Sequence, residues 1–150
     1  MKLVALLAAG AVCALVVTAS AFSGARARTT TTWNTALSAA QEVPKQVVKK
    51  PSAHGLFTAR VVGNKLKWKL TFAKLTGPAI AAHIHMGAKG KSGNVVVPLC
   101  GAKPACRSGL TGTAPLTAQL KTWFKKHLLY VNVHTAKNPA GEIRGQLNAM

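Results

Sequence analysis

Three histidines are the residues of this chain whose types and spacing could do chemistry. His83 and His85 flank Ile84 in one apolar segment, and His134 lies in another. Alternate side chains of a β-strand leave the same face, so the imidazoles of His83 and His85 should project side by side. A third imidazole from a neighbouring strand would complete a site suited to copper or zinc. The spacing therefore allows a metal centre of His83, His85 and His134.

The same spacing also fits a purely structural role. Buried imidazoles can be satisfied by hydrogen bonds to the backbone or to a carboxylate, and such a cluster would fix two strands together. A His-x-His pair does not by itself distinguish a metal ligand set from a hydrogen-bonded polar cluster. Both interpretations stay open at the level of the sequence.

Glu142 and Arg144 stand two residues apart in the last predicted strand, so they should share a face. The chain has only one other acid, Glu42. Glu142 could orient a metal-binding imidazole by accepting its second N–H. It could equally form a salt bridge with Arg144 or with a lysine.

The acids are too few for the common hydrolytic mechanisms. The chain has no aspartate, and Glu42 and Glu142 are far apart in the sequence. A paired-carboxylate site or a Ser-His-Asp triad is therefore not indicated, and no glycine-rich phosphate loop is present. We expect a protein that is not an enzyme.

The first residues have the pattern of an export signal. Lys2 precedes an apolar run over 3–17, and Ala19-Ser20-Ala21 is a cleavage site of small residues. We expect a signal peptide over 1–21, with cleavage after Ala21 or as late as Ala27. The run is short for a membrane span, so none is expected after cleavage. The mature protein should be secreted, extracellular or periplasmic, and associated with the cell surface.

The chain is strongly basic. In the full sequence Lys and Arg number 20 against two acids, for a formal net charge of +18, and cleavage after Ala21 removes only Lys2 of these charged residues. Such an imbalance attracts polyanions, so an anionic surface polymer or an extracellular protein is the expected partner. Nucleic acid is not an expected partner, because an exported protein is separated from the nucleic acids of the cell. Trp68 and Trp123 also fit core positions, which leaves them unable to stack on bases. We expect a monomer.

Two of the three cysteines indicate a disulfide. Removal of the signal peptide takes away Cys13 and leaves Cys100 and Cys106. An even number of cysteines in an exported small domain is typical of a disulfide bridge.

The pattern of the mature chain predicts an all-β fold. Segments 55–62 and 65–72 alternate around Gly63-Asn64, which is a strong hairpin signal. Further strands are expected over 33–40, 79–86, 94–99, 110–116, 129–135 and 142–147, with 138–141 as a turn. One helix is predicted near 117–127 with Thr117 as N-cap. We expect an antiparallel Greek-key sandwich or barrel of seven or eight strands, a disordered linker over 22–32 and one domain over 33–150.

Four segments together resemble a known family. They occur in the order 36–44 (ALSAAQEVP), 82–87 (AHIHMG), 130–135 (YVNVHT) and 138–146 (NPAGEIRGQ). This set resembles the chordin-type (CHRD) domain over nearly all of the mature chain. The resemblance implies an all-β domain outside the cell with a binding or structural role. Our leading interpretation is therefore a secreted CHRD module with a basic surface.

The alternative is a copper- or zinc-binding protein. A His-x-His strand in a Greek-key domain is distantly similar to copper/zinc superoxide dismutase, whose zinc site needs an aspartate that this chain lacks. Likeness of fold does not transfer an activity.

Overall fold

One antiparallel sheet contains the strands of the described residues. The computed structural model describes residues 31–45 and 52–149. Eight strands follow one another in the order β5-β4-β7-β8-β1-β2-β3-β6, and β9 pairs with β1. The elements are β1 (Thr32–Ser38), η1 (Ala39–Gln41), β2 (His54–Val62), β3 (Lys65–Ala73), β4 (Ala79–Met86), β5 (Val95–Cys100), β6 (Leu110–Pro115), α1 (Ala118–Lys125), β7 (Leu129–Thr135), β8 (Asn138–Gln146) and β9 (Asn148–Ala149).

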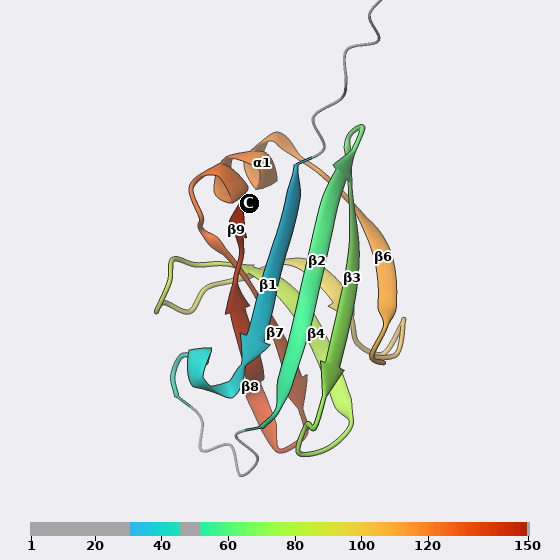
Figure 1. Cartoon of the computed structure of the whole chain (residues 1–150), viewed down its shortest axis with the longest axis vertical. Coiled ribbons are helices and arrows are strands. Elements are labelled where there is room, and N and C mark those ends of the chain that lie inside the picture. The colour runs from blue at the N-terminus through green and yellow to red at the C-terminus, as the bar shows by residue number, and fades with distance from the viewer. Residues whose placement is uncertain (1–30, 46–51, 150) are drawn as a thin grey trace, which may run out of the picture.

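The sheet curls into a nearly closed barrel. Strands β1, β2 and β3 lie in front of β4, β7 and β8 in Figure 1, and the apolar core fills the space between these layers. Its two end strands, β5 and β6, line a common cleft with α1. Each carries a proline, Pro98 and Pro115, which removes an N–H from an exposed edge. The all-β antiparallel expectation with one short helix is confirmed.

The hairpin of β2 and β3 is confirmed with the predicted register. Val62 pairs with Lys65 across the two-residue turn. Leu66 and Leu70 are fully buried, whereas Lys67 and its neighbours two residues away are exposed. The sheet therefore has one face in the core and one face in water, as its alternation predicts.

The predicted helix is also confirmed. Thr117 is its N-cap, and its Oγ1 accepts a hydrogen bond from the N–H of Leu120 at 3.1 Å. Leu120 and Phe124 point into the core, where the Phe124 ring packs on Trp33 with ring centroids 4.2 Å apart. The helix covers one end of the barrel.

One local prediction is wrong, and one short strand was not predicted. The last turn lies at residues 136–137, and the segment 138–141, which we assigned to it, already belongs to β8. Proline and glycine suggested a turn there, but Asn138 pairs with Thr135 and donates its N–H to the Thr135 hydroxyl at 3.2 Å. A short additional strand, β9, follows β8.

The disulfide is confirmed and follows β5. It joins Cys100 to Cys106 and closes a small loop. The predicted signal peptide over 1–21, and all of the predicted linker over 22–32 except Thr31 and Thr32, lie outside the described residues. Thr32 begins β1. Within the described part of the chain, no helix is long and apolar enough to cross a membrane.

Candidate metal centre

The three predicted histidines meet on the outer face of β4 and β7. His83 and His85 project from β4 on the side opposite to the core residues Ala82 and Ile84, and His134 comes from β7. One ligand nitrogen of each imidazole lies within 4.8 Å of the others. The remaining histidines, His54 and His127, are exposed and belong to no such group in the described residues. His54 is the first residue of β2.

Backbone carbonyls fix the tautomers of two imidazoles. Nδ1 of His85 lies 2.9 Å from the Gly93 carbonyl oxygen, and Nδ1 of His134 lies 2.9 Å from that of Pro139. A carbonyl oxygen only accepts, so each Nδ1 carries the hydrogen and each Nε2 keeps its lone pair. Metal-binding histidines are commonly oriented in this way.

The Nε2 lone pairs of His85 and His134 lie close to the His83 ring, and the polar atoms of this cluster are not all satisfied. Because Nε2 of His134 is the acceptor, Nδ1–H of His83 donates to it at 3.1 Å, and this hydrogen would move to the other ring nitrogen of His83 when Nδ1 binds a metal ion. Nε2 of His85 is buried and has no hydrogen-bond partner, and Oδ1 of Asn132 is also without one. Register places Asn132 directly opposite His83. Buried polar atoms are normally paired, so two unpaired atoms in one cluster call for an explanation.

The imidazoles are held neutral. Burial, followed by the charges of His134 and His85, lowers the pKa of His83 to about 4. Burial also lowers the pKa of His85 and of His134. The Gly93 and Pro139 carbonyls that accept their Nδ1–H groups act in the opposite direction on these pKa values, and for His85 the neighbouring Asn132 side chain does so as well. Neutral imidazole is the form that binds a metal ion.

A stack of three side chains supports the buried edge of the cluster. The Tyr130 ring lies almost parallel to His85, with centroids 4.8 Å apart and an interplanar angle of 9°. The guanidinium carbon of Arg144 lies 3.4 Å from the Tyr130 ring centroid, a cation–π contact. Arg144 also donates to the Lys91 carbonyl oxygen at 2.9 Å. This stack therefore ties His85 to the loop over 87–93.

Gly93 brings that loop onto the cluster. Its carbonyl accepts from His85, and its N–H donates to the Tyr130 hydroxyl at 3.2 Å. A Cβ at this position would collide with the backbone oxygen of Met86. Only glycine allows the loop to approach so closely, so the orientation of His85 depends on it.

Glu142 is part of a separate buried network. Its carboxylate accepts hydrogen bonds from the N–H and hydroxyl of Thr76, the hydroxyl of Thr135 and the amide of Asn138. These bonds, and not contacts with Arg144 or an imidazole, satisfy it in the described structure. Burial would raise its pKa, but the bonds from Thr135, Thr76 and Asn138 outweigh burial and lower it. Its role is to join the segment before β4 to the β7–β8 turn.

Glu42, and not Glu142, is the acid that interacts electrostatically with Arg144. Its side chain is 2% exposed, and its Oε1 has no hydrogen-bond partner. Burial raises its pKa to about 7, although the nearby charge of Arg144 and the Val43 backbone lower it. A Cβ at Gly141 would lie 2.6 Å from this carboxylate, so Glu42 occupies the space that a side chain at 141 would fill.

Sequence reasoning missed the groups that orient the histidines. Tyr130, Asn132 and His134 stand at every second position of β7, so their side chains share one face. This spacing was a usable signal that Tyr130 and Asn132 lie near His134. The carbonyls of Gly93 and Pro139 had no signal, because any residue supplies a carbonyl and only the fold aims it.

The chain was compared with protein families, curated proteins and solved structures. Residues 33–147 match the model of the family described as the CHRD domain. Neither the curated proteins nor the solved structures contain a match to the chain.

Proposed function

The chain belongs to the CHRD domain family, and on that premise we propose that it is an exported protein whose His83–His85–His134 centre binds one copper or zinc ion. One observation carries the proposal. Nε2 of His85 is buried without a hydrogen-bond partner, while its Nδ1–H is committed to a carbonyl. A lone pair held in this way has the orientation and tautomer that a metal ligand needs.

The donor set fits such an ion. Imidazole nitrogens bind zinc at about 2.0–2.1 Å, so the ligand nitrogens around an ion stand roughly 3.3–3.6 Å apart. His83 and His134 are already at 3.1 Å, and the three ligand atoms lie within 4.8 Å. Small side-chain rotations that move the ligand nitrogens by about 1 Å would bring the more distant pair to this separation. His83 is only half-buried, which leaves a path for solvent and metal.

The proposed role is binding rather than catalysis. Glu142 is committed to Thr76, Thr135 and Asn138, and Glu42 lies beside Gly141 and Arg144. Neither carboxylate is arranged to serve as a general base for a metal-bound water. A zinc-loaded sample is therefore expected to hydrolyse an activated ester no faster than the His85→Gln variant treated in the same way.

Export is supported by two features. The first residues have the composition of a signal peptide, and the Cys100–Cys106 disulfide is of the kind that persists in oxidising compartments. Sequencing of the N-terminus of protein recovered from the culture medium or periplasm tests export. We expect the mature chain to begin after Ala21 or after Ala27.

Metal titration of the apo protein tests the centre. Calorimetry with Zn(II) and with Cu(II), supported by elemental analysis, should give one ion per chain. His85→Gln and His134→Gln should each weaken binding by about 100-fold, since each removes one of three ligands. His54→Gln is the matched control, because His54 is exposed and outside the cluster, and it should bind as the unchanged protein does.

The thermal unfolding midpoint of each apo variant is measured first, so that loss of binding is not confused with loss of fold. Absence of a stoichiometric ion in the unchanged protein, or full binding by both cluster variants, would contradict the proposal. A preference for copper or for zinc in the paired titrations assigns the ion.

A further inference from the structure

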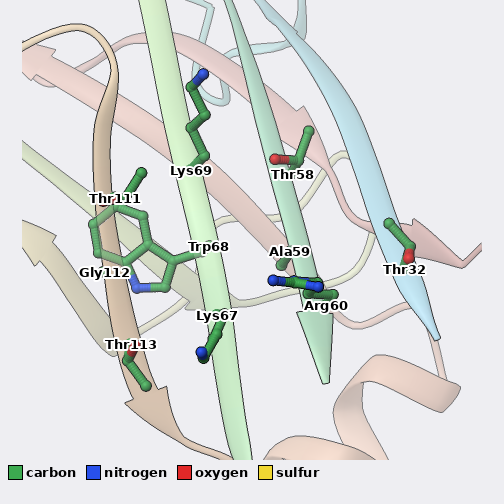
Figure 2. Close-up of a pocket in the computed structure, with 10 residues that line it drawn as sticks. All are labelled: Thr32, Thr58, Ala59, Arg60, Lys67, Trp68, Lys69, Thr111, Gly112 and Thr113. Carbon is green, nitrogen blue, oxygen red and sulfur yellow. The ribbon is translucent and has the colours of Figure 1, made fainter. Parts of the chain in front are cut away.

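A second polar surface lies on the outer face of the front layer, away from the histidines. It is a groove of about 410 Å³ across β2, β3 and β6, shown in Figure 2. We call it the basic groove and define it by Thr58, Arg60, Lys67, Lys69, Thr111 and Thr113. In the sheet order, β8 and β1 separate these strands from β4 and β7. The two surfaces therefore lie on opposite layers of the barrel (Figure 1).

The strand register sets the groups of the groove in two rows. Arg60 of β2 is directly opposite Lys67 of β3, and Thr113 of β6 is opposite Lys67 on its other side. The next row holds Thr58, Lys69 and Thr111 in the same way. Neighbouring strands are about 4.8 Å apart, and residues two apart along a strand are about 6.8 Å apart. Three cations and three hydroxyls thus lie side by side at short, regular distances.

The facing cations are not explained by stability. Like charges directly opposite one another on a sheet are destabilising. The four adjacent strands β1, β2, β3 and β6 contain no acid. Both acids of the chain, Glu42 and Glu142, are buried next to or within β8. Arg60 and Lys67 are therefore kept together against their repulsion, which an anionic ligand would relieve.

We propose that the basic groove binds a linear anionic polysaccharide. The cations suit its carboxylate or sulfate groups, and the flanking threonine hydroxyls suit its sugar hydroxyls. Lys67 and Lys69 extend from one strand in the same direction, so the groove favours an extended chain with repeated charges over a single small anion. Arg60 can bind a carboxylate or sulfate in two-point fashion.

Other anionic polymers fit less well. Single-stranded nucleic acid is held by exposed aromatic platforms. Trp68, which lies beneath the groove, is 7% exposed and belongs to the core. A membrane surface would be met by apolar side chains beside the cations. Leu56 and Val62 are exposed at the two ends of this face of β2, but within the groove threonines stand next to Lys67 and Lys69. The hydroxyl-lined rows favour a sugar polymer.

Binding of a heparin oligosaccharide and of polygalacturonate to the folded protein tests this proposal. The triple variant Arg60→Gln, Lys67→Gln, Lys69→Gln should lose about 30-fold or more in affinity for heparin at low salt. The slope of log affinity against log salt should fall by about 2, as expected when three ionic contacts are lost. Lys121→Gln, Lys125→Gln, Lys137→Gln is the matched control, since it removes the same charge at exposed sites elsewhere. The control should lose less than about 3-fold.

Three outcomes would overturn the proposal. The first is that the groove variant and the control variant lose the same affinity for heparin. The second is that neither polysaccharide binds at low salt. The third is that single-stranded DNA or anionic phosphatidylglycerol vesicles bind as tightly as the polysaccharides or more tightly. Heparin and polygalacturonate separate sulfate from carboxylate recognition. His85→Gln should keep full polysaccharide binding, so failure of the metal centre and failure of the groove are read separately.

Discussion

The outer face of β4 and β7 and the outer face of β2 and β3 both carry basic side chains, but they are organised differently. On the first, His85 and His134 are 8% exposed and each has a carbonyl that fixes its ring. On the second, Arg60, Lys67 and Lys69 are exposed. Burial with hydrogen bonds preorganises a few atoms for a small ligand, whereas exposed charges set a field for a large and flexible one.

This comparison gives a sharp expectation for the pH dependence of metal binding. The pKa of His83 is about 4, and those of His85 and His134 are also lowered, so protons should compete weakly with metal. Between pH 7 and pH 5 the affinity should fall much less than the roughly thousandfold or more expected for three imidazoles of ordinary pKa. Calorimetric titrations at the two pH values measure this. A fall in affinity as large as that of three ordinary imidazoles would indicate that the rings are exposed to solvent, which would contradict the structure.

Glu142→Ala should destabilise the layer that carries the histidines more than any change in the basic groove. The change removes the acceptor for Thr76, Thr135 and Asn138 inside the protein, which should lower the free energy of unfolding by about 3 kcal/mol. Urea unfolding at pH 7 measures it. Glu142→Gln keeps one acceptor oxygen and should lose less. Equal stability of the alanine variant and the unchanged protein would contradict the role of this network.

Glu42 should make the histidine-bearing layer sensitive to pH. Its pKa is about 7 when folded, against an ordinary value of 4.5, so between these values the folded chain binds more protons than the unfolded chain. Stability should therefore fall as pH rises through this window, by about 2–3 kcal/mol, and level off above pH 7. Glu42→Gln should lack this fall. Urea unfolding of both proteins from pH 5 to pH 8 measures this, and taking the difference between them removes the contribution that the histidines make to both. If the two free energies of unfolding change equally with pH, the raised pKa of Glu42 is refuted.

Removal of charge from the basic groove should have the smallest effect on folding, and of opposite sign. Lys67→Gln ends the repulsion with Arg60 and should stabilise the protein by about 0.2–1 kcal/mol, while weakening polysaccharide binding. Thermal unfolding at low salt measures the gain, which should shrink as salt rises. Lys137→Gln, in the exposed β7–β8 turn, is the control. A loss of stability in Lys67→Gln would mean that the lysine supports the sheet.

Much of the framework could be predicted because it rests on local patterns. Alternation in β3 separated Leu66 and Leu70 from the lysines, and Gly63-Asn64 fixed the register that faces Arg60 with Lys67. Thr117 marked the start of α1. Local signals failed at Pro139 and Gly141, where β8 continues through an irregular stretch between the Thr135–Asn138 and Val133–Ile143 pairs instead of forming the predicted turn.

By itself the sequence determined that His83 and His85 share a face, since alternation is a property of the extended backbone. It also determined the excess of cations, the cysteine pair and the hairpin. Only the tertiary structure decided that His134 of β7 joins the pair, that the carbonyls of Gly93 and Pro139 set the tautomers, and that β6 brings Thr113 beside Lys67. Register between distant strands depends on how the whole core packs, and no short segment encodes it.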